Sequence, residues 1–116
     1  MSLELSPWDR KIPYTNKTTG YTTTLYNINV VATYLGRTSQ TVRKWEIAGV
    51  IPKTPFKIEG KRLYSKEQIE ILVECAEKAQ ISSGKKISQT NFTRNVQLKW
   101  QALFKEIFGD TTGGKE

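Results

Sequence analysis

The sequence contains no histidine and only one cysteine, Cys75. One cysteine cannot form a disulfide within a chain, and without histidine a Cys/His zinc site is excluded. The chain also lacks the side chain that most often transfers protons near neutral pH. We therefore expect no enzyme, no metal and no cofactor. Cys75 falls inside an apolar helical pattern, where we interpret it as a plain buried thiol.

Other patterns that carry chemistry are missing too. Residues 82–86, SSGKK, lack the first glycine and the Ser or Thr after the lysine that a phosphate-binding loop needs. The glutamates of residues 67–77 recur at spacings of three and four, which is typical of the solvated stripe of an amphipathic helix. No hydrophobic run has the length of a membrane span, and the start has no hydrophobic signal region. We expect an intracellular protein with no membrane partner.

Acidic residues are scarce in the first half of the chain. Of 116 residues, 18 are Lys or Arg and 11 are Asp or Glu, which gives a formal net charge of +7. Residues 1–64 hold ten basic and four acidic residues, whereas residues 65–116 hold eight and seven. This concentrated positive charge favours a polyanionic partner, either nucleic acid or an anionic membrane surface. Charge alone does not decide, because many small proteins are basic without binding either.

Two short helices are expected in the middle of the chain. Apolar residues recur at helical spacing from Ile28 to Leu35, and Gly36 ends that pattern. Thr38 or Ser39 can cap a second helix that runs to about residue 48. The link between the two is about three residues long, so the pattern predicts a helix-turn-helix in outline.

A ribbon and two more helices should follow. The spacing of apolar residues over 50–64 predicts two strands that turn around residues 59–61. The sequence S-x-x-Q at 65–68 has the form of a capping box and opens a helix to about residue 80. A last helix, about 91–108, carries many large apolar side chains that pack across their own domain or against a second copy or protein partner. The residues expected in a partner contact are Trp100, Leu103, Phe104, Ile107 and Phe108.

The second helix, residues 39–48, raises the main question about function, because its outer face is basic. At 100° per residue, Val42 and Trp45 form the packing side and Glu46 is expected at its edge. The opposite side carries an amide, two cations and an aliphatic side chain, namely Gln40, Arg43, Lys44 and Ile47. Arg can bridge the edge of guanine, Gln that of adenine, and an aliphatic tip can touch a thymine methyl. A merely solvated basic face is the alternative.

The ribbon also favours DNA binding, because Lys57, Lys61 and Arg62 lie near its turn. Residues 26–73 resemble the MerR-type winged helix-turn-helix, a module similar to that of excisionase-like and other phage-borne DNA-binding proteins. The matching pieces are Val31-Ala32 to Leu35-Gly36, Thr41-Val42-Arg43-Lys44-Trp45-Glu46, Gly49-Val50-Ile51-Pro52 and Arg62-Leu63-Tyr64-Ser65. In that family the second helix enters the major groove and the wing follows the backbone.

The resemblance implies which residues contact DNA. Tyr64 resembles a core position of the family, although its hydroxyl is also expected near a phosphate. The full expected set is Arg37, Ser39, Gln40, Thr41, Arg43, Lys44, Lys57, Lys61, Arg62 and Tyr64. The polar break at 82–86 and the lone Cys75 depart from MerR regulators, so we do not expect a metal or drug sensor.

The predicted fold is mainly α: a winged helix-turn-helix with a small two-stranded wing, an extended N-terminal arm and an additional C-terminal amphipathic helix. The expected divisions are an arm at 1–25, the winged domain at 26–81, a linker at 82–90, the packing or oligomerisation helix at 91–109 and a tail at 110–116. The arm, with Trp8, Tyr14 and Tyr21, packs back on the domain or docks on a partner.

The predicted function is sequence-preferring binding of double-stranded DNA, as a small cytoplasmic or nucleoid-associated transcriptional regulator of a phage or mobile element. Two alternatives stay open. One is an accessory DNA-binding factor for recombination or packaging, of the excisionase or small terminase subunit type. The other is a protein-interaction module that keeps the winged fold as a scaffold.

Overall fold

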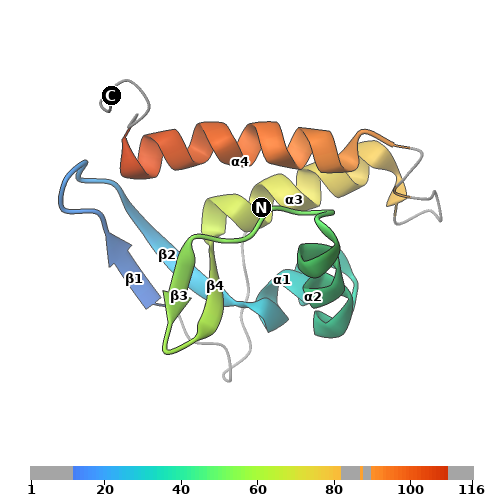
Figure 1. Cartoon of the computed structure of the whole chain (residues 1–116), viewed down its shortest axis with the longest axis horizontal. Helices are drawn as coiled ribbons and strands as arrows, with labels where there is room; N and C mark the ends of the chain where they lie inside the picture. The colour runs from blue at the N-terminus through green and yellow to red at the C-terminus, as the bar shows by residue number, and fades with distance from the viewer. Residues whose placement is uncertain (1–11, 82–86, 88–89, 110–116) are drawn as a thin grey trace.

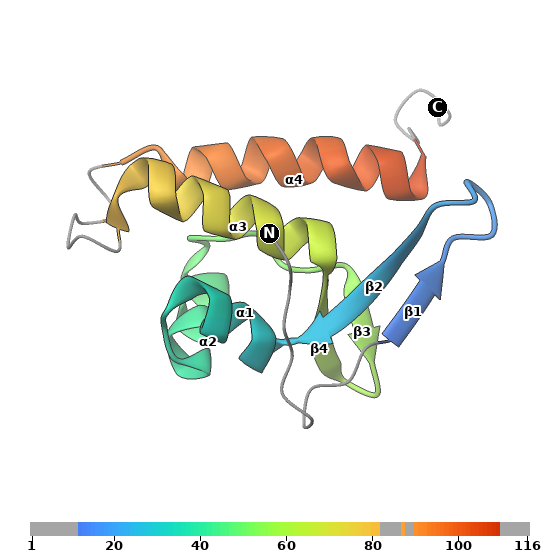
Figure 2. The ribbon, with the colours of Figure 1, turned by 180° about the vertical axis from the view of Figure 1, so that it is seen from behind.

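The computed structural model describes residues 12–81, 87 and 90–109 (Figures 1 and 2). Within this part, the chain forms an α/β domain of four helices and one curled four-stranded sheet. The elements are β1 (Ile12–Thr15), β2 (Thr22–Asn27), α1 (Ile28–Leu35), α2 (Ser39–Ala48), β3 (Phe56–Ile58), β4 (Lys61–Ser65), α3 (Lys66–Ala79) and α4 (Phe92–Phe108).

The sheet is larger than the expected two-stranded ribbon. Its strand order is β1-β2-β4-β3 and every pair is antiparallel. Strand β2 pairs with β4, with Tyr26 opposite Tyr64, and covers an edge that a two-stranded ribbon would leave open. The described part of the expected arm is therefore built into the domain, and Tyr14 packs edge-on against Phe56 with ring centroids 5.0 Å apart. Trp8 lies outside the described residues.

Local sequence signals set the helix ends as expected. The side chain of Asn27 accepts a hydrogen bond from the Val30 amide at the start of α1, and Gly36 ends that helix in the left-handed region. Thr38 caps α2 in the same way. Ser65 and Gln68 form the predicted capping box of α3. Residues 36–38 alone link α1 to α2, so the two helices are held close together.

The last helix, α4, packs along α3 on the side of the molecule away from α2 and the β3–β4 turn (Figures 1 and 2). Its inner face is buried within the chain itself, and Trp100 donates a hydrogen bond to the Gln68 carbonyl at 3.2 Å. Of the five side chains expected to contact a partner, Trp100, Leu103 and Ile107 are buried, and Phe104 and Phe108 are half-buried. The structure therefore follows the first alternative for this helix, packing across its own domain.

The described residues include no helix with both the length and the apolarity needed to cross a bilayer. Cys75 is buried in α3, as the apolar pattern around it predicted.

Candidate nucleic-acid interface

Helix α2 presents one exposed face that is both basic and partly apolar. Its buried side is anchored by Val42, while Trp45 is half-buried and packs against Phe92 at a centroid distance of 5.6 Å. The exposed face carries Gln40, Arg43, Lys44 and Ile47. Ile47 is 77% exposed, although it is a large hydrophobic residue. The helical wheel had predicted this division of the helix into two faces.

The β3–β4 hairpin lies beside this face. Its turn is made by Glu59 and Gly60, both with positive φ (53° and 78°), which is the conformation that joins two strands through a two-residue loop. Lys57 and Lys61 are exposed, and Arg62 is half-buried. Because Lys57 lies opposite Arg62 in the register, the hairpin concentrates three cations within a few residues of its tip.

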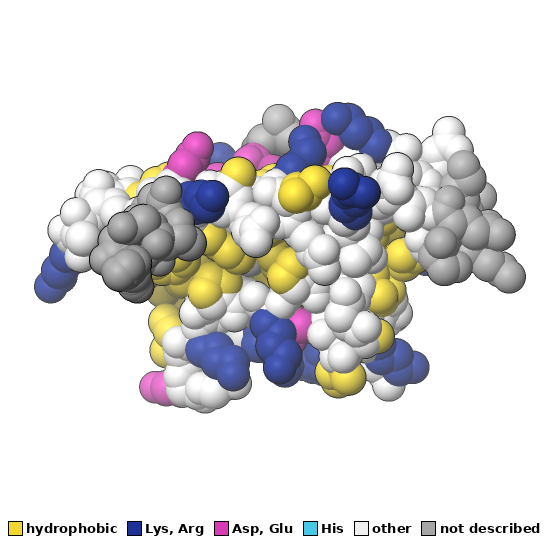
Figure 3. Space-filling view, turned by 45° about the horizontal axis from the view of Figure 1, so that its top comes forward, with side chains coloured by type: hydrophobic (Ala, Val, Ile, Leu, Met, Phe, Trp, Pro, Cys, Tyr) yellow, Lys and Arg dark blue, Asp and Glu magenta, His cyan; other side chains and the backbone are white. Residues whose placement is uncertain are grey.

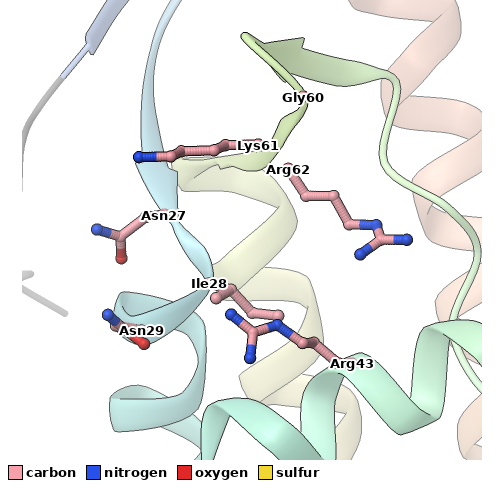
Figure 4. A pocket seen from close by; sticks show the side chains of 7 residues that line it. All are labelled: Asn27, Ile28, Asn29, Arg43, Gly60, Lys61 and Arg62. Atoms are coloured by element: carbon pink, nitrogen blue, oxygen red, sulfur yellow. The ribbon is translucent and has the colours of Figure 1, made fainter.

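A groove of about 380 Å³ separates α2 from the hairpin. It is lined by Asn27, Ile28, Asn29, Arg43, Gly60, Lys61 and Arg62. Figure 4 shows the Arg43 guanidinium pointing from α2 toward α1, and the Lys61 side chain extending from β4 toward the Asn27 amide. Asn27 and Asn29 were not among the residues that the sequence predicted at this surface. Their position at the groove depends on the pairing of β2 with β4, for which the sequence offers no local signal.

Glu46 is the main correction to the sequence analysis, which placed it at the edge of the packing side. It is only 3% exposed. One carboxylate oxygen forms an ion pair with Nε of Arg62, and the other accepts hydrogen bonds from the Thr54 amide (3.3 Å) and the Tyr64 hydroxyl (3.4 Å). The sequence did indicate that Glu46 is buried, because on the helical wheel it lies about 40° from Val42, on the packing side.

Two residues expected to contact DNA are used elsewhere. Tyr64 is fully buried, so the expectation that its hydroxyl faces a phosphate is wrong. Burial and the Glu46 carboxylate raise the pKa of Tyr64, so the hydroxyl stays protonated and donates to Glu46. Arg37 is exposed, but its guanidinium donates a hydrogen bond to the Ile81 carbonyl at 2.8 Å and ties the α1–α2 turn to the end of α3.

The remaining expected contacts lie at the start of α2. Ser39 and Thr41 are half-buried. The Thr41 amide donates to the Thr38 hydroxyl at 3.2 Å, and the two hydroxyls are 3.0 Å apart. The structure therefore brings Arg43, Lys61 and Arg62 together around the groove. Gln40 and Lys44 are exposed on the same helix and Lys57 on the same hairpin, and we call these six residues together the basic face.

The basic face lies at the end of the molecule opposite α4. In the space-filling view of Figure 3, Lys and Arg side chains gather along the lower edge, where Figure 1 places α2 and the β3–β4 turn. On the other side, charges are mixed: Glu74 of α3 pairs with Lys78 at 3.3 Å and with Lys99 of α4 at 3.5 Å. The positive charge is therefore concentrated at one end and largely balanced at the other.

Comparison with known protein families, with curated proteins and with solved structures found no match to this chain. The function of the chain is therefore inferred from the basic face itself.

Proposed function

We propose that this protein binds double-stranded DNA with a preference for particular sequences, as a winged helix-turn-helix in which α2 is the recognition helix and the β3–β4 hairpin is the wing. One observation carries the proposal: Arg43 of α2 shares a groove with Lys61 and Arg62 of the adjacent hairpin, beside an exposed helix face that carries Gln40, Lys44 and Ile47. An ordinary solvated helix has no such neighbour.

The side chains on α2 suit the floor of the major groove, which is about 12 Å wide and admits a helix. Arg43 and Gln40 have the donor geometry to bridge the edges of guanine and adenine. Ile47 offers an apolar tip for a thymine methyl, which gives a reason for its 77% exposure. These contacts would supply sequence preference.

The hairpin cations suit the sugar-phosphate backbone. Lys57 and Lys61 are exposed and long enough to follow phosphates without reading bases. Their role is to hold the recognition helix in register. Within this class we favour a small transcriptional regulator, as the resemblance of residues 26–73 implies.

Binding to a short duplex, measured by fluorescence anisotropy over a range of salt concentrations, tests the proposal. For each phosphate contact, the logarithm of the association constant should fall by about 0.9 per tenfold increase in salt. Lys61→Ala should reduce this slope by about one contact. Lys105→Ala, an exposed cation on α4, is the matched control and should leave the slope unchanged. Equal effects of the two substitutions, or no binding by the wild type at low salt, would overturn the proposal.

A further inference from the structure

The ion pair between Glu46 and Arg62 joins the two halves of the basic face. Glu46 belongs to α2 and Arg62 to β4, so the pair crosses from the recognition helix to the wing. The Glu46 side chain is 1% exposed, whereas that of Arg62 is 37% exposed and lines the groove. The pair therefore has a buried acidic end and a basic end that reaches the DNA-facing surface.

The surroundings of Glu46 fix its carboxylate. Its second oxygen accepts from the Thr54 amide and the Tyr64 hydroxyl. Thr54 is in turn held by hydrogen bonds to the Leu63 carbonyl at 2.6 Å and from Gln68 at 3.3 Å. A buried carboxylate with three partners on two other segments has little freedom to move, and it orients the guanidinium that it binds.

The contact on Arg62 is made through Nε. A guanidinium has a planar, forked set of donors, and its terminal nitrogens match the spacing of two phosphate oxygens. An arginine that is already held at Nε loses less conformational entropy when those terminal nitrogens bind a ligand. A lysine in the same place could supply charge but not this geometry.

We propose that Glu46 is a positioning residue, which holds the guanidinium of Arg62 in one orientation so that its terminal nitrogens bind one DNA phosphate through two hydrogen bonds. The inference rests on the proposed function and deepens it. It changes the role of Arg62 from a loose electrostatic contact of the wing to an ordered one, set by a residue of the recognition helix.

The direction in which Glu46→Gln changes DNA affinity distinguishes this role of Glu46 from a purely electrostatic effect. Glu46 carries a negative charge behind a surface that binds a polyanion, so removing the charge should strengthen binding if charge is all that matters. In Glu46→Gln, the remaining oxygen can still accept from Thr54 and Tyr64, but the neutral amide no longer forms an ion pair with Arg62. If Glu46 positions Arg62, the same substitution should weaken binding.

The experiment compares the wild type, E46Q, R62K and the double variant on one short duplex at one salt concentration. E46Q and R62K should each lower affinity about tenfold, which is the loss expected for one charge-assisted hydrogen bond. The double variant should bind no more weakly than R62K, because the two residues act as a unit. E59Q is the control: Glu59 is an exposed acid at the hairpin turn, so its removal should leave affinity unchanged or raise it slightly.

A second readout needs no DNA. In the wild type, ¹⁵N relaxation at Nε of Arg62 should report an ordered side chain, because the ion pair with Glu46 holds it, and E46Q should lower that order. Thermal unfolding confirms that each variant is folded at the assay temperature. If E46Q fails to fold, the affinity of R62K and the order of the wild-type Arg62 side chain still test the inference.

The inference is overturned if E46Q binds as tightly as the wild type or more tightly, if R62K retains full affinity, or if the two losses add in the double variant. These outcomes leave DNA binding itself intact. A wild type that binds no duplex at low salt would instead sink the proposed function, and the inference with it.

Discussion

Replacement of Trp100 by alanine should destabilise the whole domain. Trp100 is fully buried, packs against Tyr64 and Phe104 at centroid distances of 6.3 and 6.0 Å, and donates a hydrogen bond to the Gln68 carbonyl. Truncation of a buried tryptophan to alanine costs about 3–5 kcal/mol, because the packing is lost and a cavity remains. That loss is a large share of the roughly 5–15 kcal/mol by which domains are stable.

Urea denaturation followed by circular dichroism measures this loss. Leu98→Ala is the matched control, because Leu98 lies on the same helix but is 55% exposed; its cost should stay within about 0.5 kcal/mol. A loss below about 1 kcal/mol for Trp100→Ala would refute the placement of α4 in the core. The apolar face of α4 would then be free to serve a partner.

Two further predictions concern titratable groups. A hydrogen bond from Lys78 and the charges of Lys78 and Lys99 lower the pKa of Glu74. The contribution of Glu74 to stability is therefore present above its pKa in the unfolded chain and is lost as pH falls through its pKa in the folded chain. The destabilisation by Glu74→Gln at neutral pH should vanish at about pH 3 in thermal unfolding. Burial raises the pKa of Cys75, so an alkylating reagent should label the folded protein much more slowly than the protein in urea, and equal labelling rates would contradict the buried position of the thiol.

The helices could be predicted from the sequence because their signals are local. Caps at Thr38 and Ser65 and stops at Gly36 and Gly49 lie within a few residues of the ends they set. The sheet could be predicted only in part. The pairing of β2 with β4 joins residues about 40 positions apart, and no local pattern in the threonine-rich segment encodes that choice.

The candidate site, too, could be predicted from the sequence only in part. The exposed face of α2 follows from helix periodicity alone, so Arg43 and Lys44 could be placed before the structure was known. The burial of Glu46 follows from the same wheel, but an isolated charge is rarely expected inside a domain. The buried carboxylate of Glu46 is stabilised by Arg62, Thr54 and Tyr64, which belong to a later part of the chain.

The central claim, that α2 reads DNA sequence, is tested most directly by selection of bound duplexes from a random pool, with the wild type and Arg43→Ala compared at near-physiological salt. We predict that the wild type recovers a motif and that Arg43→Ala loses preference at one position of it, while still binding DNA. Recovery of no motif by the wild type, or of the same motif by both proteins, would contradict the assignment of α2 as a recognition helix that reads bases through Arg43.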